Sequence, residues 1–199
     1  MAAQPLAPDA AAGPLLTTAR LTLMPITVED AFDIVALHRD PKVSGLLVDG
    51  IPDTLPKAIA MQRWNAPMAA AGYGTFAVRR HDETRVIGLF SLAPFGDDAD
   101  LLEFGGRLLP DAWRGGIGVE AGAALIDHAF GALGRDRLVS AFHPDNRSAP
   151  AALRRLGFGG AAATTLFGRP VMVMTLTAGL WAAQGRRVKP ARAMRPDGS

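Results

Sequence analysis

The stretch PDAWRGGIGVEA, residues 110–121, decides the fold because it joins two segments with different hydrophobic patterns. Before it, residues 101–109 form an apolar run of the length of a strand. After it, apolar residues recur at every fourth position, at Ile117, Ala121, Leu125, Ala129 and Leu133. This spacing places them on one face of a helix. The sequence therefore predicts a strand, a glycine-dense turn and an amphipathic helix.

The same turn is a candidate anion site. The first N–H groups of a helix lack partners within it and carry the positive end of its dipole, which favours an anion there. Gly115, Gly116 and Gly118 allow a bulky pyrophosphate to approach the backbone, and Arg114 adds a forked donor. The alternative interpretation is that these glycines make a tight connection and close helix packing without binding a ligand.

The rest of the chain predicts a mixed α/β sheet in one domain, residues 17–181. Strands are expected at residues 20–26, 73–79, 85–92, 101–109, 137–142 and 169–177, and helices between Thr27 and Pro41, at residues 55–71, from Ile117 and at residues 147–156. Phe32, Val35, Ala36 and Leu37 are the expected buried face of the first helix. Pro67 is expected to break or kink the second helix. Residues 1–16 are expected to be a flexible lead-in.

The composition is that of a soluble globular protein, with 199 residues, 49% of them hydrophobic and 20% charged. The absence of cysteine excludes a disulfide framework, a thiolate zinc site and a cysteine nucleophile. The N-terminus lacks a secretory signal, and the longest apolar run, residues 171–183, is too short to span a bilayer. We therefore expect a cytoplasmic protein with no membrane partner.

The net charge of +2 is unevenly distributed. Residues 182–199 carry five arginines and lysines against one aspartate, a net +4, which leaves −2 for the rest of the chain. We expect this basic tail to be a flexible, solvated extension. The alternative is weak, non-specific contact with nucleic acid, which is not otherwise an expected partner.

Three ordered sets of residues resemble the GNAT acyltransferases. Residues 113–118 (WRGGIG) resemble that family's acetyl-CoA pyrophosphate signature, Arg/Gln-x-x-Gly-x-Gly/Ala. Residues 146–158 (NRSAPAALRRLGF) resemble its second signature, an asparagine followed by a short helix and a closing Leu-Gly-Phe. The segments TARLTLMP (residues 18–25), EDA (29–31) and DPKV (40–43) resemble the RimJ/RimL-like branch, the protein N-terminal acetyltransferases.

The resemblance implies the family's fold and cosubstrate. The fold is a mostly antiparallel mixed sheet, flanked by helices, whose fourth and fifth strands splay apart to admit the pantetheine arm of acetyl-CoA. No metal is implied. The implied cofactor-binding residues are Gly106, Arg107 and Leu108 along the arm, Trp113, Arg114, Gly115, Gly116, Ile117 and Gly118 at the pyrophosphate, and Asn146 after the fifth strand.

The resemblance further implies direct attack of a neutral amine on the thioester, with Glu103, His143 and Ser148 as catalytic candidates. Glu103 stands where relatives have the carboxylate of Glu-Ile-Gly, which often accepts the amine proton, and the alternative is a solvated strand carboxylate. His143 can titrate near neutral pH but fits a capped turn equally well. Leu153 and Ala149 stand where relatives carry a tyrosine or a serine acid, and Ser148 lies one position early.

Together these features predict an acetyl-CoA-dependent N-acetyltransferase that acts on a primary amine, foremost the α-amine of a protein or peptide. Two alternatives stay open: a small-molecule amine acetyltransferase for aminoglycosides or polyamines, and a catalytically silent acetyl-CoA-binding module. The acceptor end is expected at the loop after Asp40, the second helix and residues 159–168. Arg63, Trp64, Tyr73 and Phe167 are candidate lining side chains there. A homodimer is left open.

Overall fold

The computed structural model describes residues 15–47, 51–96, 98–166 and 168–185. Of the expected lead-in, residues 1–16, all but Leu15 and Leu16 lie outside the described residues, and Leu16 is buried and begins a strand. Of the expected tail, residues 182–199, those from residue 186 lie outside, and residues 182–183 end a helix. The elements in chain order are β1 (Leu16–Thr17), β2 (Leu21–Pro25), the 3₁₀ turn η1 (Val28–Asp30), α1 (Ala31–Arg39), α2 (Pro41–Ser44), α3 (Leu55–Ala70), β3 (Gly74–Arg80), β4 (Gly88–Phe95), β5 (Asp98–Leu108), the 3₁₀ turn η2 (Pro110–Ala112), α4 (Ile117–Gly131), β6 (Arg137–Phe142), α5 (Ser148–Arg155), β7 (Gly159–Leu166), β8 (Arg169–Thr177) and α6 (Ala178–Ala183).

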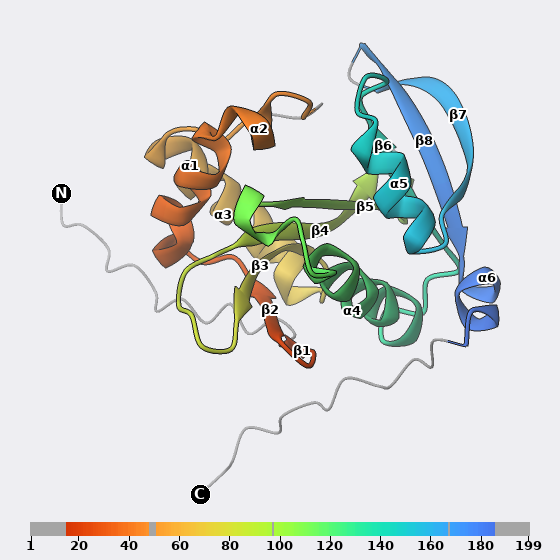
Figure 1. Ribbon diagram of the computed structural model, residues 1–199, viewed down its shortest axis with the longest axis horizontal. Helices are drawn as coiled ribbons and strands as arrows, with labels where there is room; N and C mark the ends of the chain where they lie inside the picture. The colour runs from red at the N-terminus through yellow and green to blue at the C-terminus, as the bar shows by residue number, and fades with distance from the viewer. Residues whose placement is uncertain (1–14, 48–50, 97, 167, 186–199) are drawn as a thin grey trace, which may run out of the picture.

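The eight strands form one sheet in the order β1-β2-β3-β4-β5-β6-β8-β7 (Figure 1). Neighbouring strands are antiparallel except β5 and β6, which are parallel. This one parallel pair is joined by the crossover helix α4, and the strand, glycine-dense turn and helix predicted for residues 101–133 are the first part of that connection. The expected mixed, mostly antiparallel sheet is confirmed.

Alternating side chains of the central strands enter two hydrophobic cores, one on each face of the sheet. On β3, Phe76 and Val78 join the core that contains Leu125 of α4. Ala77, between them, points the other way and joins the core that contains Ile34 of α1. Helices α1 and α3 therefore cover one face and α4 the other, and the two layers hold β4 and β5 between them (Figure 1).

The first helix buries a different face from the expected one. Val35 and Leu37 are buried as predicted, but Phe32 is 74% exposed and Ala36 is exposed as well. Phe32 and Ala36 lie four positions apart and share the outward face of α1. His38 also belongs to the buried face of α1, although the hydrophobic pattern did not include this polar residue. Its Nδ1 lies 2.7 Å from the carbonyl oxygen of Ile34.

Pro67 does not break the second helix, because α3 continues to Ala70. A proline in the last turn removes a single backbone hydrogen bond, while Asn65, Met68 and Ala69 stay buried against the sheet and hold the turn in place. Four elements were not predicted: β1, α2, β7 and α6. Among the described residues, no helix is both long and apolar enough to cross a membrane.

Candidate active site

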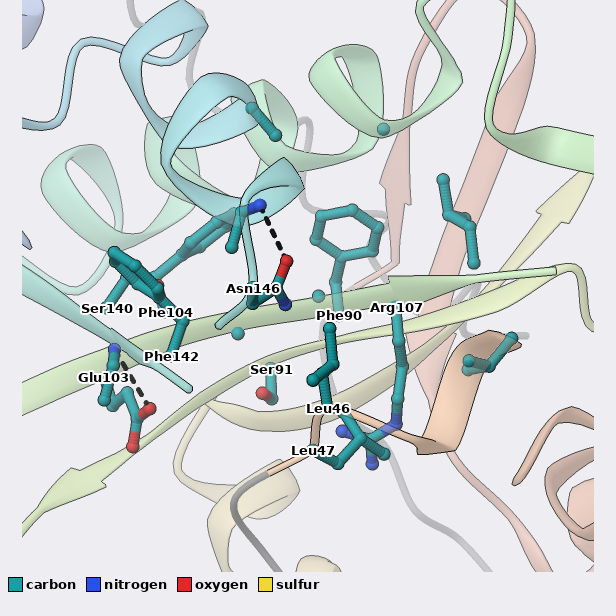
Figure 2. Close-up of a pocket in the computed structure, with 18 of the residues that line it drawn as sticks. Leu46, Leu47, Phe90, Ser91, Glu103, Phe104, Arg107, Ser140, Phe142 and Asn146 are labelled. Atoms are coloured by element: carbon teal, nitrogen blue, oxygen red, sulfur yellow. Dashed lines mark hydrogen bonds between the residues drawn. The ribbon is translucent and has the colours of Figure 1, made fainter. Parts of the chain in front are cut away.

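Strands β5 and β6 diverge near the middle of the sheet. Their parallel register covers Leu102 opposite Leu138 and Glu103 opposite Val139. Beyond this point β6 stays paired with β8 as far as Phe142. The residues of β5 after Glu103 have no register partner on the described part of β6. A pocket of about 1580 Å³ opens between the two strands (Figure 2). The splay expected between the fourth and fifth predicted strands is therefore present.

The glycine-dense turn closes one end of this pocket. Gly115 and Gly116 have φ values of +71° and +78°, in the left-handed region that side chains rarely adopt, and Gly116 directly precedes α4. Trp113, Arg114 and Gly118 also line the pocket. The free N–H groups at the start of a 15-residue helix therefore face a cavity that is open to a ligand.

The expected cofactor residues, with one exception, lie around this pocket. Those that line it are Gly106, Arg107, Leu108, Trp113, Arg114, Gly115, Gly116, Gly118 and Asn146. The exception is Ile117, whose side chain is buried in the core on the α4 face of the sheet. Its backbone N–H, in the first turn of α4, is thus the part of Ile117 that can face an anion.

A cluster formed by Thr18, Arg20 and Glu120 joins the beginning of the chain to the first turn of α4. Arg20 Nε donates to Glu120 Oε2 over 2.7 Å, and the Arg20 backbone N–H donates to Oε1 over 2.9 Å. Thr18 Oγ1 also donates to Oε1, over 2.6 Å. Burial alone would raise the pKa of Glu120, but these hydrogen bonds outweigh it and hold the pKa below its ordinary value.

The position of this cluster is tied to the glycine turn. A Cβ atom on Gly115 would lie 3.8 Å from Arg20 Nη1, and one on Gly116 would lie 3.9 Å from Arg20 Nη2. Two segments that the sequence analysis singled out separately, residues 18–25 and 113–118, therefore meet in space.

Glu103 lies on β5 inside the pocket, with its carboxylate turned toward β6. Its Oε1 accepts a hydrogen bond of 3.3 Å from the backbone N–H of Ala141 (Figure 2). Two residues further on, Gly105 adds no side chain to this face of β5. A larger residue would not fit there, because its Cβ atom would lie 2.8 Å from Ser91 Oγ. A carboxylate therefore borders an open stretch of backbone, an arrangement that suits a proton acceptor beside a reacting group.

His143 and Ser148 differ in their relation to the pocket. His143 is not among the residues that line it, and its Nδ1 accepts a hydrogen bond of 3.2 Å from the backbone N–H of Asp145. This is the capped turn that the sequence analysis gave as the alternative. Ser148 lines the pocket, but its hydroxyl donates to Asn146 Oδ1 over 2.8 Å. The side chains of Ala149 and Leu153, which also line the pocket, offer no proton donor.

The remaining histidines are packed in the interior or lie on the surface, away from the pocket. His38 and His128 are buried, and His128 Nε2 lies 2.6 Å from the carbonyl oxygen of Gly72. His81 is on the surface, with Nε2 3.1 Å from the carbonyl oxygen of Thr18.

The other end of the pocket is formed by α2, the residues after it and α3. Trp64 lines the pocket, whereas Arg63 and Tyr73 do not, and Phe167 lies outside the described residues. Sequence reasoning missed Leu46, Met61 and Ser91, and it assigned Arg107 a backbone role alone. In Figure 2, the Arg107 side chain extends from β5 toward the segment that carries Leu46 and Leu47.

A signal for part of this wall was present in the sequence. Lys57, Ala60, Met61 and Trp64 are spaced as one stripe of a helix. The adjacent face of α3 carries Ala58, Gln62, Asn65 and Ala69, which are buried. The stripe therefore marks a second face that lines a cavity.

Comparisons with known proteins agree with this geometry. Residues 20–159 match the family described as "Acetyltransferase (GNAT) domain". The uncharacterized N-acetyltransferase YoaA of Bacillus subtilis is 27% identical over 146 residues, which cover 73% of this chain and 82% of that protein. The FsC-acetyl coenzyme A-N(2)-transacetylase of Aspergillus fumigatus is 31% identical over 132 residues, covering 62% of this chain and 55% of the fungal protein.

Among solved structures, Mycobacterium smegmatis RimJ in complex with CoA-disulfide has a similar fold. It superposes with a TM-score of 0.64 at 19% identity, covering 87% of this chain and 94% of RimJ. At this identity the likeness concerns the fold alone.

Proposed function

The chain belongs to the GNAT acetyltransferase family, and on that premise we propose that it transfers an acetyl group from acetyl-CoA to the α-amine of a peptide or protein N-terminus. The observation that carries the proposal is one continuous pocket. It runs from the glycine turn, along the unpaired edge of β5, to the wall formed by α2 and α3.

Acetyl-CoA fits this pocket by chemistry. The diphosphate would bind at the turn, on the N–H groups at the start of α4 and on the Arg114 guanidinium. The pantetheine arm carries amides, which suit the backbone edge that β5 exposes between Gly106 and Leu108. Asn146, in the loop between β6 and α5, would contact the cosubstrate from the other side of the gap.

The transfer would proceed in one attack. The lone pair of the neutral amine forms a bond to the carbonyl carbon of the thioester, and backbone N–H groups of β5 stabilise the oxygen as it becomes negative. The carbon–sulfur bond then breaks and the electron pair leaves with sulfur. The nitrogen loses one proton to Glu103, directly or through a water molecule, and the thiolate takes up a proton from solvent.

The acid and base groups of the pocket favour an amine that deprotonates easily. An α-amine has a pKa of about 7.8 and a lysine side chain one of about 10.4, so a neutral lysine costs roughly 3.5 kcal/mol more to prepare. Ala149 and Leu153 provide no acid for the leaving sulfur. A thiol with a pKa of about 8.5 is nevertheless a fair leaving group near neutral pH. This supports an α-amine acceptor, as does the RimJ-like fold.

A second candidate is a small-molecule amine acetyltransferase. The observation in its favour is the fungal relative, whose name gives FsC as the acceptor. The release of free thiol from acetyl-CoA separates the two candidates when it is measured with short peptides, polyamines and aminoglycosides as acceptors. Turnover with peptides supports the first candidate, and turnover confined to polyamines or aminoglycosides supports the second. No release with any acceptor, together with acetyl-CoA binding in calorimetry, would indicate a catalytically silent binding module.

The role of Glu103 has its own test. Glu103→Gln keeps the size of the side chain and removes the proton acceptor, so we expect kcat to fall about 10²- to 10⁴-fold. The matched control is Glu29→Gln, at an exposed carboxylate outside the pocket, which should leave kcat unchanged. Unchanged turnover in Glu103→Gln would mean that Glu103 is a solvated strand carboxylate.

A further inference from the structure

The wall of the pocket opposite the glycine turn contains an unusual amount of accessible apolar surface. Trp64 on α3 is 60% exposed, and Leu46, just after α2, is 41% exposed. Both line the pocket together with Met61 of α3. We call Leu46, Met61 and Trp64 the apolar wall. Large side chains left accessible inside a pocket mark the part of the ligand that they would cover.

The apolar wall is continuous with the proposed reaction centre. Leu46 and Leu47 lie on the same side of β5 as Glu103, Ser91 and Arg107 (Figure 2). Between them, Gly105 adds no side chain to β5, and the small side chain of Ser91 lies beside it. A substituent on the carbon next to the attacking amine would therefore point from the reaction centre toward the apolar wall.

The charges around the pocket argue against a polycationic acceptor. Among the described residues that line it, Glu103 is the single carboxylate. Lys57, on the same stripe of α3 as Trp64, is paired with Asp53 over 2.7 Å. An aminoglycoside or polyamine carries several ammonium groups, each of which needs a carboxylate or water when it binds. An acceptor with one amine and one apolar side chain needs no carboxylates beyond Glu103.

The part of the apolar wall on α3, Met61 and Trp64, is anchored to β3. Asn65, the neighbour of Trp64, is fully buried. Its Oδ1 accepts from the backbone N–H of Thr75 over 2.6 Å, and its Nδ2 donates to the Thr75 carbonyl oxygen over 3.0 Å. The close approach requires Gly74, since a Cβ there would lie 2.4 Å from Asn65 Oδ1. A binding surface fixed in advance loses little conformational entropy when its ligand binds.

From these observations we infer that the acceptor carries a bulky apolar side chain next to its amine, as a peptide beginning with leucine, methionine or phenylalanine does. Trp64 is then a specificity-determining residue. This inference rests on the proposed function. In an apolar pocket, two substrates that differ by one methylene group differ in kcat/KM by roughly 10- to 200-fold. We expect a preference at the lower end of this range, because the wall is partly open.

The experiment compares kcat/KM for two peptides that differ in the first residue alone, leucine against alanine, with the full-length protein. We expect a preference for leucine of about 10-fold or more, which Trp64→Ala reduces to about 2-fold or less and Trp64→Phe largely retains. Phe32→Ala is the matched control, since Phe32 is an aromatic residue exposed on α1 outside the pocket. It should keep the wild-type ratio. The KM for acetyl-CoA should not change in any of these variants.

Equal kcat/KM for the two peptides in the wild type, or the same ratio in Trp64→Ala and Phe32→Ala, overturns this inference while leaving peptide acetylation in place. Acetylation confined to polyamines or aminoglycosides overturns the proposed acceptor and this inference together. The melting temperature of Trp64→Ala should stay close to that of the wild type, because the indole is mostly exposed.

Discussion

Gly116→Val tests whether the backbone of the glycine turn binds the diphosphate. A valine Cβ at this position would meet Arg20 Nη2 at 3.9 Å, an ordinary contact, so crowding adds little to the cost. The cost comes from the backbone, because φ is +78° and an L-residue in this region loses about 1–2 kcal/mol, with β-branched residues among the least tolerant. For a domain of this size, the loss lowers the melting temperature by about 2–8 °C.

The effect on binding follows from how the strain is relieved. If the turn relaxes toward negative φ, the N–H groups before α4 rotate away from the pocket. Loss of one hydrogen bond to a charged oxygen costs about 1.5–3 kcal/mol, and this weakens acetyl-CoA binding roughly 10- to 150-fold. Isothermal titration calorimetry with acetyl-CoA measures this change, and thermal unfolding measures the stability of the same samples.

Gly134→Val is the matched control. Gly134 has φ of +61° and nothing within 4 Å of its would-be Cβ, and it lies outside the pocket between β5 and β6. It should lose a similar amount of stability and bind acetyl-CoA as tightly as the wild type. If both variants are destabilised and both bind acetyl-CoA normally, the turn is a tight connection and the diphosphate binds elsewhere.

Two further predictions concern stability. Glu120→Ala removes the acceptor of three hydrogen bonds, two of them from Arg20, whose side chain is half-exposed, and we expect a loss of about 2 kcal/mol at pH 7 in urea unfolding. Because the folded protein holds the pKa of Glu120 below its unfolded value of about 4.3, this stabilisation is full above that pH and is lost as the pH falls through the folded pKa. The wild type and the variant should therefore converge in acid, and a constant difference down to pH 3 would contradict this account. Asn65→Ala leaves the buried N–H of Thr75 without its partner, whereas the Thr75 carbonyl oxygen keeps the hydrogen bond that it accepts from the backbone N–H of Ile26, so we expect a loss of about 1–3 kcal/mol in thermal unfolding. A loss below about 1 kcal/mol would mean that α3 is held to β3 by apolar packing alone.

The parts of the fold that the sequence predicted are those with a local signal. The bounds of β6 and β8 were predicted as they are found, since each is an apolar run set off from its neighbours by turns or helices. The glycine turn and α4 were predicted because the hydrophobic period changes there. β7 was missed because its sequence, GGAAATTL, has no apolar alternation, and its pairing with β8 supplies what its propensity lacks.

The residues of the candidate site also divide into those that a local sequence motif predicts and those that it does not. Glu103, the glycines and Asn146 stand in recognisable short motifs, and these residues line the pocket. Leu46, Met61 and Ser91 belong to three different segments; the helical stripe marks Met61, but the proximity of the three depends on tertiary packing that no local pattern encodes. Phe32 shows the converse error, because a large apolar residue at a plausible helical position faces solvent.

The cluster of Thr18, Arg20 and Glu120 accounts for a feature that conflicts with anion binding at the glycine turn. A carboxylate in the first turn of a helix opposes a second anion at the same end, at a cost of about 4 kcal/mol for unit charges 4 Å apart near a protein surface. Glu120 is that carboxylate, and Arg20, one hundred residues earlier in the chain, neutralises it with its Nη2 2.6 Å from Oε2. The Arg20 guanidinium also lies beside Gly115 and Gly116. A diphosphate bound at this turn would therefore have the positive charge of Arg20 nearby, while the negative charge of Glu120 is already neutralised by Arg20. The N-terminal segment therefore contributes to the electrostatics of the proposed cofactor site as well as to the sheet.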